Sequence, residues 1–475
     1  MEKSVKISRT LSVFMLTMIN VATIGSVKNW PTMAEYGLSS VFFFLLGALI
    51  FFIPSSLVSA ELATGWPKLG GVFVWVKEAF GHRFGFLAAW LLWCQTVVWY
   101  PTALSFVASA LAFIFDPVLA QNKLFTFLTI FILFWASTLI NFRGMRTSGW
   151  ISSVGMILGT FFPGIVIIAL GLFWLLLGKP SQIDWSWNKL IPNMNSPHQL
   201  ALFTGVMISL AGIEMSAVHA RDVQHPKKDY PRAIFWTVLT IIGLSIPGIL
   251  AIAIVIPQQN ISLVAGSLQA IQVFLDAYNL RALGPLLCLL IAVGAISSVS
   301  TWIVGPTKGL LAAAQSGDLP PLFRQVNKQA MPVSLLVFQG IIASILATFF
   351  IFLPSLNEAY LILMVIVSEL YLLMYLLMFA AAIKLRYTKP HVERSYKVPG
   401  GNKGMWIIAS LGFLAALFAI IIGFFPPEQL PIQNKTNYVL LLLGSVLIFV
   451  LGPSIILLFQ KPSWKKALAH ERLEE

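Results

Sequence analysis

The chain has 475 residues, of which 58% are hydrophobic and only 10% are charged, and its mean hydropathy is +0.85. Soluble domains carry about 25% charged residues, so this composition excludes an ordinary soluble enzyme or binding module. The net charge of +13 could suggest a nucleic-acid partner, but its distribution along the chain favours a membrane protein. We therefore expect one polytopic membrane domain over residues 1–475 and no nucleic-acid partner.

Twelve apolar runs are long enough for a helix to cross a bilayer, which requires about 20 mainly apolar residues. In chain order, the predicted spans are 11–35, 39–61, 84–115, 122–141, 150–178, 199–220, 232–256, 278–312, 333–354, 358–386, 404–425 and 437–460. The segment 261–276 is too short to span, and we expect it to lie along the surface or to pack as a re-entrant helix. The first run lacks a small-residue cleavage site, which predicts a retained helix and not a signal peptide.

Positive charge alternates between the loops that join these spans. Of the 31 lysines and arginines, 25 fall on the side of the predicted membrane that holds both termini, 5 fall on the other side, and Lys28 lies within a span. Loops rich in Lys and Arg stay in the cytoplasm. The chain is therefore predicted to be a multi-pass protein of the cell (inner) membrane with cytoplasmic N- and C-termini.

Two predicted spans are interrupted by glycine and a charged residue at matching places. The first span contains Gly25-Ser26-Val27-Lys28, and the sixth contains Ala211-Gly212-Ile213-Glu214. Non-helical backbone is tolerated at membrane depth only where protein buries it or where it lines a cavity. Paired interruptions in two halves of a chain indicate the binding site of a secondary transporter.

Lys28 and Glu214 are ionisable residues within spans, where a charge is costly and indicates function. Lys28 could hold a substrate carboxylate or take the place of a coupling cation; alternatively, its side chain snorkels to the outer interface beside Trp30. Glu214 could couple protonation or pairing to opening and closing, or it could cap unwound backbone. A Lys28–Glu214 pair across the two interruptions is a further alternative.

Other polar and aromatic residues of the spans are weaker candidates. Tyr371 and Tyr375 share one helix face at i, i+4, and Glu369 lies off that face, so we expect little from Glu369. His219, just past the second interruption, has the side chain of a pH sensor, although a polar residue at the cytoplasmic end is the simpler interpretation. Trp99 and most other aromatic residues are expected to face lipid or core.

Half-helix ends at such interruptions predict the class of substrate. N-terminal ends present free N–H groups to a carboxylate, whereas C-terminal ends and unwound carbonyls suit an ammonium group. Both together suit a zwitterion, which favours an amino acid over a sugar or an inorganic ion. Cys94 and Cys288 lie in apolar runs without metal-ligand spacing, and no ATP-binding loop or catalytic triad occurs. No metal, cofactor or enzymatic activity is therefore expected.

Four groups of motifs give the chain a family resemblance. They are Ala60-Glu61-Leu62-Ala63-Thr64-Gly65-Trp66-Pro67 with Gly70-Gly71-Val72-Phe73-Val74-Trp75-Val76, Pro226-Lys227-Lys228-Asp229-Tyr230-Pro231, Trp302-Ile303-Val304-Gly305-Pro306-Thr307-Lys308-Gly309, and Val398-Pro399-Gly400-Gly401. In these motifs the chain resembles the amino acid–polyamine–organocation superfamily and, within it, the glutamate/GABA antiporter branch. The matches run from the first span to the last.

The resemblance implies an all-α integral membrane fold of twelve transmembrane helices. Helices 1–5 (about 11–178) and 6–10 (about 199–386) would form the 5+5 inverted repeat of the leucine-transporter type, with helices 1 and 6 broken and two extra C-terminal helices (about 404–460). It also implies a central site between spans 1, 3, 6, 8 and 10, with spans 1, 2, 6 and 7 moving against the rest.

The resemblance can be carried over residue by residue. Glu214 matches the sixth-span glutamate of the family, and Tyr371 and Tyr375 match tenth-span tyrosines near the substrate. Two positions depart from the antiporter pattern: Lys28 aligns with a first-span aromatic residue, and Ser298 aligns with an eighth-span acid. Both departures change the charge of the predicted path.

The predicted function is secondary active amino acid transport, with exchange of the glutamate/GABA antiporter type favoured and proton-coupled import as the alternative. A sensor that binds an amino acid without moving it is a third alternative, and a channel would need a repeated ring of charge. The expected partners are amino acids and the lipid bilayer, with protons and a second copy of the chain left open.

Overall fold

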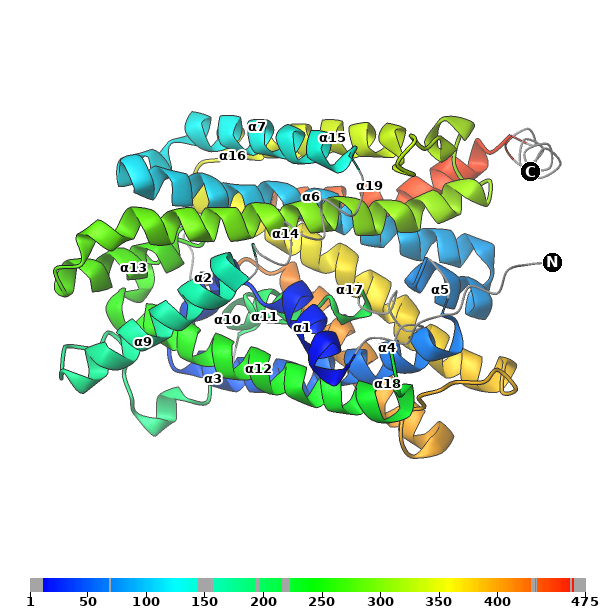
Figure 1. Cartoon of the computed structure of the whole chain (residues 1–475), viewed down its shortest axis with the longest axis horizontal. Helices are drawn as coiled ribbons and strands as arrows, with labels where there is room; N and C mark the ends of the chain where they lie inside the picture. The colour runs from blue at the N-terminus through cyan, green and yellow to red at the C-terminus, as the bar shows by residue number, and fades with distance from the viewer. Residues whose placement is uncertain are drawn as a thin grey trace.

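The computed structural model describes residues 12–67, 70–143, 155, 157–192, 196–215, 223–428, 432, 434–461 and 464. Every regular element in these residues is a helix, as the long apolar runs predicted. Most of the helices run along the long axis of the molecule (Figure 1). The chain is therefore an all-helical protein in the part that the structure describes.

Eleven helical stretches of the described residues are long and apolar enough to cross a membrane. Each overlaps a span predicted from the sequence, and together they account for every predicted span except the first. They are Ser39–Gly65 (with α3 Ser39–Gly47 and α4 Ile53–Gly65), α6 (His82–Phe115), α7 (Lys123–Asn141), Ile157–Leu176 (with α9 Phe162–Leu176), Pro197–Met215 (with α10 Pro197–Leu200 and α11 Phe203–Ser209), α12 (Pro226–Val255), Arg281–Gln315 (with α14 Gly284–Gln315), Val333–Phe352 (with α15 Val333–Ala347 and α16 Phe349–Phe352), α17 (Leu356–Thr388), α18 (Gly401–Gly423) and α19 (Lys435–Leu458).

The first predicted span, 11–35, is a broken helix. α1 (Val13–Ile24) ends at Gly25, a 3-10 turn covers Val27–Asn29, and α2 (Trp30–Ala34) follows. The sixth predicted span is broken in the same way, because α11 ends at Ser209 and the backbone at Ala211 and Gly212 is not helical. Both predicted interruptions are confirmed.

The short segment predicted at 261–276 forms α13 (Gly266–Ala277), and most of its residues are buried. Ser267 Oγ donates a hydrogen bond of 2.9 Å to the carbonyl of Val27, in the first interruption. α13 therefore packs into the protein and gives the Val27 carbonyl a second donor besides the backbone N–H of Trp30.

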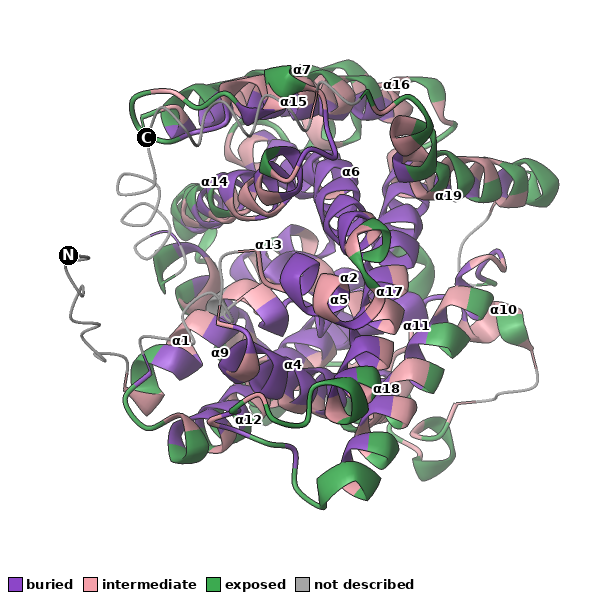
Figure 2. Ribbon diagram, turned by 90° about the vertical axis from the view of Figure 1, so that its right-hand side faces the viewer, coloured by how far each residue is buried: buried purple, intermediate pink, exposed green. Residues whose placement is uncertain are grey.

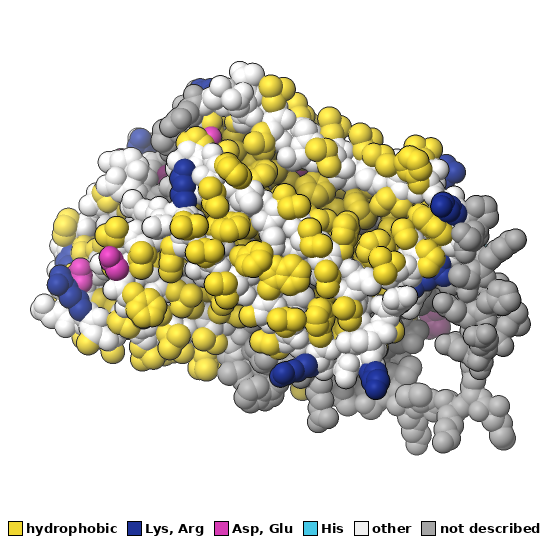
Figure 3. Space-filling model, turned by 90° about the horizontal axis from the view of Figure 1, so that it is seen from above, with side chains coloured by type: hydrophobic (Ala, Val, Ile, Leu, Met, Phe, Trp, Pro, Cys, Tyr) yellow, Lys and Arg dark blue, Asp and Glu magenta, His cyan; other side chains and the backbone are white. Residues whose placement is uncertain are grey.

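The helices are arranged in a buried centre and an apolar outer layer. Within their most apolar windows, 78% of α6 and 83% of α17 are buried but only 17% of α19, and Figure 2 shows buried residues along α6 and α17 with exposed residues along α7, α15 and α19. Hydrophobic side chains cover the face above α7 and α15, and lysines and arginines gather toward its edges (Figure 3). Such a surface suits a protein surrounded by lipid.

Glycines set the close packing of the fifth and eighth spans. A Cβ atom on Gly159 would overlap the backbone of Gly294 in α14, and one on Gly155 would overlap Ser297. Small residues let helix backbones approach in this way. Gly155 and Gly159 therefore pack helices against each other, as expected for a small-xxx-small pair.

Gly159→Ala is expected to destabilise the protein by about 1–3 kcal/mol, because the added methyl group meets backbone that cannot rotate away. The thermal midpoint of the purified protein in detergent should fall. Gly243 in α12 is the matched control, since its added methyl group would meet no atom within 4 Å. Gly243→Ala should leave the midpoint unchanged or slightly raised, and equal losses in the two variants would contradict the packing argument.

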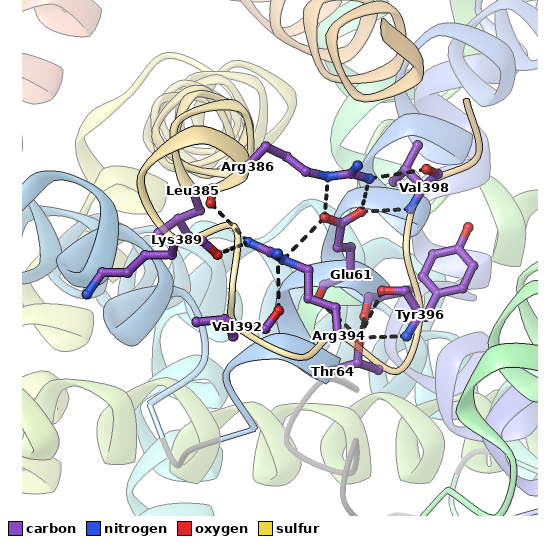
Figure 4. Close-up of polar contacts among 10 residues, drawn as sticks. Glu61, Thr64, Leu385, Arg386, Lys389, Val392, Arg394, Tyr396 and Val398 are labelled. Atoms are coloured by element: carbon purple, nitrogen blue, oxygen red, sulfur yellow. Dashed lines mark hydrogen bonds and ion pairs between the residues drawn. The ribbon is translucent and has the colours of Figure 1, made fainter. Parts of the chain in front are cut away.

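Two of the sequence motifs meet at one end of the molecule in a buried cluster of charges (Figure 4). The carboxylate of Glu61, in α4, accepts hydrogen bonds of 2.6 Å from both Nε and Nη2 of Arg386 and of 2.7 Å from the backbone N–H of Val398. Arg394 Nε lies 3.4 Å from the same carboxylate. We call Glu61, Arg386, Arg394 and Val398 the Glu61 cluster. Its contacts connect the end of α17 and the segment between α17 and α18 to α4.

Candidate functional site

The two interruptions meet α6, α14 and α17 around one cavity. Its wall is formed by Thr23, Ile24, Gly25, Ser26, Lys28 and Asn29 of the first interruption, Gln95, Trp99 and Thr102 of α6, Ile208 and Ala211 at the second interruption, Ser298 and Trp302 of α14, and Tyr360, Met364, Val367 and Tyr371 of α17. The volume of the cavity that is open to the centre of a water molecule is about 70 Å³. One water needs roughly 10–15 Å³ of such volume, so the cavity is several times larger than a single-water site. The cavity therefore has room for a small organic molecule.

Glu214 joins the second interruption to α17. The hydroxyl groups of Tyr371 and Tyr375 each donate a hydrogen bond to one oxygen of its carboxylate. Tyr375 Oη in turn accepts a 2.9 Å hydrogen bond from the backbone N–H of Gly212. The carboxylate is buried, hydroxyl groups donate to both of its oxygens, and it forms no ion pair with a described lysine or arginine. We call Gly212, Glu214, Tyr371 and Tyr375 the Glu214 tie.

The backbone at Gly212 requires glycine. Its φ is +120°, in a region that residues with a Cβ rarely adopt. The position is also tight, because a Cβ atom would lie 3.3 Å from the carbonyl oxygen of Thr23 in the last turn of α1. The second interruption therefore lies against the backbone at the end of α1, directly before the first interruption.

Lys28 is buried in the cavity wall, with only 5% of its surface exposed. Its Nζ lies 3.4 Å from Thr102 Oγ1, 5.1 Å from the ring centre of Trp99 and 5.8 Å from that of Tyr360. No described carboxylate forms an ion pair with it. The interpretation of a lysine snorkelling to the outer interface is therefore wrong, and so, in this conformation, is a Lys28–Glu214 pair.

A second cavity adjoins the first on the side of α14 and the fifth span. Thr23, Gly25, Ser26, Lys28, Ser298 and Trp302 line both cavities. Gly159 and Thr160 line the second cavity only. Lys28 and Ser298 therefore line both cavities, where the two adjoin.

The structure brings together all nine residues predicted for the site. Gly25, Ser26, Lys28, Ala211, Ser298 and Tyr371 line the cavity, and Gly212, Glu214 and Tyr375 lie behind its wall in the Glu214 tie.

The remaining lining residues include several that the sequence analysis did not select. Trp99 was expected to face lipid or core, and this was wrong because it lines the cavity; Thr102, Trp302 and Tyr360 were missed. Hydroxyl groups within long apolar runs are the signal that could have identified Thr102 and Tyr360.

Glu369 lies away from the cavity, as its position off the tyrosine face indicated. Its buried carboxylate approaches α18 at Gly423, where a Cβ atom would overlap it, and neither oxygen has a hydrogen-bond partner among the described residues. His219 lies outside the residues that the structure describes.

A membrane protein in which two broken helices flank a central polar cavity has the construction of a secondary transporter. A family model for amino acid permeases matches residues 9–447. The chain therefore belongs to the amino acid permease family, within the amino acid–polyamine–organocation superfamily, and it is an amino acid transporter by this membership.

Individual relatives match over nearly the whole chain. It is 44% identical to an uncharacterized transporter of Legionella pneumophila, over 94% of this chain and 96% of that protein. It is 34% identical to a glutamate/gamma-aminobutyrate antiporter of Lactococcus lactis, over 94% and 90% of the two chains. It is 24% identical to a probable agmatine/putrescine antiporter of the same species, over 89% of each chain.

Proposed function

We propose that the protein is a secondary active amino acid antiporter of the cell membrane that works by alternating access around the central cavity. The proposal includes twelve spans with cytoplasmic termini, the broken first helix being one of them, and a 5+5 inverted repeat followed by two extra helices. The nine residues named above form the substrate and coupling site. Proton-coupled import is the alternative, and the 34% identical antiporter favours exchange over it.

The observation that carries the proposal is the Glu214 tie. It connects the broken sixth span to α17 directly behind the cavity wall, and Tyr371 both lines the cavity and donates to Glu214. A molecule that touches Tyr371 therefore acts on the same hydrogen bonds that hold the two helices together. A ligand can shift a conformational equilibrium only through such differential contacts.

The test is counterflow into liposomes that contain the purified protein. Vesicles are loaded with a mixture of unlabelled amino acids or with buffer, and uptake of each radiolabelled amino acid is measured at acidic and at neutral pH. For an antiporter, we expect uptake only into loaded vesicles. Uptake into empty vesicles that needs an inward pH gradient would replace exchange with proton symport, and no uptake of any amino acid would contradict transport altogether.

A further inference from the structure

We propose that Lys28 makes the cavity selective for substrates with a net negative charge and binds one of their carboxylate groups. The inference rests on the proposed function, since it names the substrate class of the same cavity. It would make Lys28 the residue that determines specificity.

The charge of the cavity is the first observation. Among the described residues that line it, Lys28 is the only charged side chain. The carboxylate of Glu214 lies behind the wall, where it accepts from Tyr371 and Tyr375, and it forms no ion pair with Lys28, so it is not a counter-ion in contact with the ammonium group. A buried cation without a counter-ion is costly, so an anionic ligand is the group that would stabilise it.

The geometry around Lys28 is the second observation. An ammonium group has three donors, and the one hydrogen bond that Lys28 makes with the described residues, to Thr102, is long at 3.4 Å. The rings of Trp99 and Tyr360 stabilise the cation from the side but accept no conventional hydrogen bond. Donors therefore remain free for a carboxylate, while the aromatic and hydroxyl groups hold the amine in place.

The opposite end of the substrate has a different environment. The C-terminus of the twelve-residue α1 opens on the cavity at Thr23, Ile24 and Gly25, and a helix C-terminus suits an ammonium group. A substrate with one ammonium group there and a carboxylate on Lys28 is a zwitterion. A second carboxylate gives the net charge of −1 that balances the cavity.

The same argument excludes cationic substrates. A diamine or a basic amino acid would bring further positive charge into a space where Lys28 is the only charged residue among the described lining and where none of these lining residues is a carboxylate. Two like charges in a water-poor site repel strongly. The chain should therefore differ from its relative that is named as a probable agmatine/putrescine antiporter.

Glutamate and glutamine provide the sharpest test, because they have almost the same shape and differ by one charge. We expect glutamate to stabilise the purified wild-type protein against heating, and to compete for counterflow, at concentrations at least tenfold lower than glutamine. Putrescine and lysine should do neither. If glutamate and glutamine are equally potent on the wild-type protein, or if putrescine or lysine is preferred over glutamate, the proposal is overturned, and no variant is needed for this test.

Lys28→Met removes the charge and keeps the length of the side chain. The tenfold preference for glutamate should disappear, while glutamine binding persists. Lys28→Arg should keep a preference for glutamate. If Lys28→Met weakens both ligands equally, Lys28 acts on the conformation of the protein and not on specificity, and the proposal fails.

The two readouts separate this inference from the proposed function. If glutamate selectively stabilises the protein but no counterflow occurs, the proposed antiporter function is contradicted, whereas the proposed charge selectivity of the cavity is supported. Counterflow of neutral or basic amino acids at concentrations as low as those needed for glutamate would support transport and overturn the role of Lys28.

Discussion

Glu214→Gln should reduce counterflow at least tenfold while expression and monodispersity of the protein stay unchanged. The glutamate carboxylate accepts from two tyrosine hydroxyls, whereas the amide of glutamine has one accepting oxygen and a donating NH₂ group. One tyrosine hydroxyl must therefore accept a hydrogen bond from the NH₂ group instead of donating one, or lose its hydrogen-bond partner. Hydrogen bonds to a charged group are worth about 1.5–3 kcal/mol, and about 1.4 kcal/mol corresponds to a factor of ten in rate.

Glu369→Gln is the matched control for Glu214→Gln. Both glutamates are buried within the transmembrane helices, and both substitutions change a carboxylate to an amide of the same size. Glu369 faces α18 and does not line the cavity, so its variant should retain most of the counterflow. Similar losses in the two variants would mean that any buried carboxylate matters, and the specific role of the Glu214 tie would be lost.

Glu61→Ala should lower the stability of the protein by about 3–5 kcal/mol, which is the usual cost of leaving a buried charge without its partner. The substitution leaves the buried guanidinium groups of Arg386 and Arg394 unpaired and removes the acceptor of the Val398 N–H. The measurement is the thermal midpoint of the protein in detergent.

The ion pair of Asp276 with Arg281 provides the control for Glu61. Its nitrogen and oxygen are 2.6 Å apart, as in the Glu61 cluster, but its side chains are exposed by 37% and 78%. Exposed pairs contribute at most about 1 kcal/mol, so Asp276→Ala should barely move the midpoint. A midpoint for Glu61→Ala that matches the control would show that the cluster does not hold the α17–α18 segment.

The sequence by itself determined the helices and the places where they break. Apolar runs of about 20 residues must form helices in a bilayer, because lipid offers no partner for backbone N–H and C=O groups. The same rule made Gly25-Ser26 and Ala211-Gly212 exceptional, and the structure is not helical there. Helical spacing also indicated that Glu369 would stand apart from Tyr371 and Tyr375.

Only the tertiary structure decided which side chains meet. Glu61 and Arg386 are 325 residues apart in sequence, and the residues around them gave no sign of the pairing. From the sequence, Lys28 could hold a substrate carboxylate or take the place of a coupling cation, snorkel to the interface or pair with Glu214. Trp99 was expected to face lipid or core, and it lines the cavity. The physical reason is that hydrophobicity along a chain fixes which residues enter the membrane, whereas the rotation and packing of whole helices fix which of them face each other. In a bilayer those rotations depend on small contacts such as Gly159 against Gly294, which act across the fold and not along the sequence.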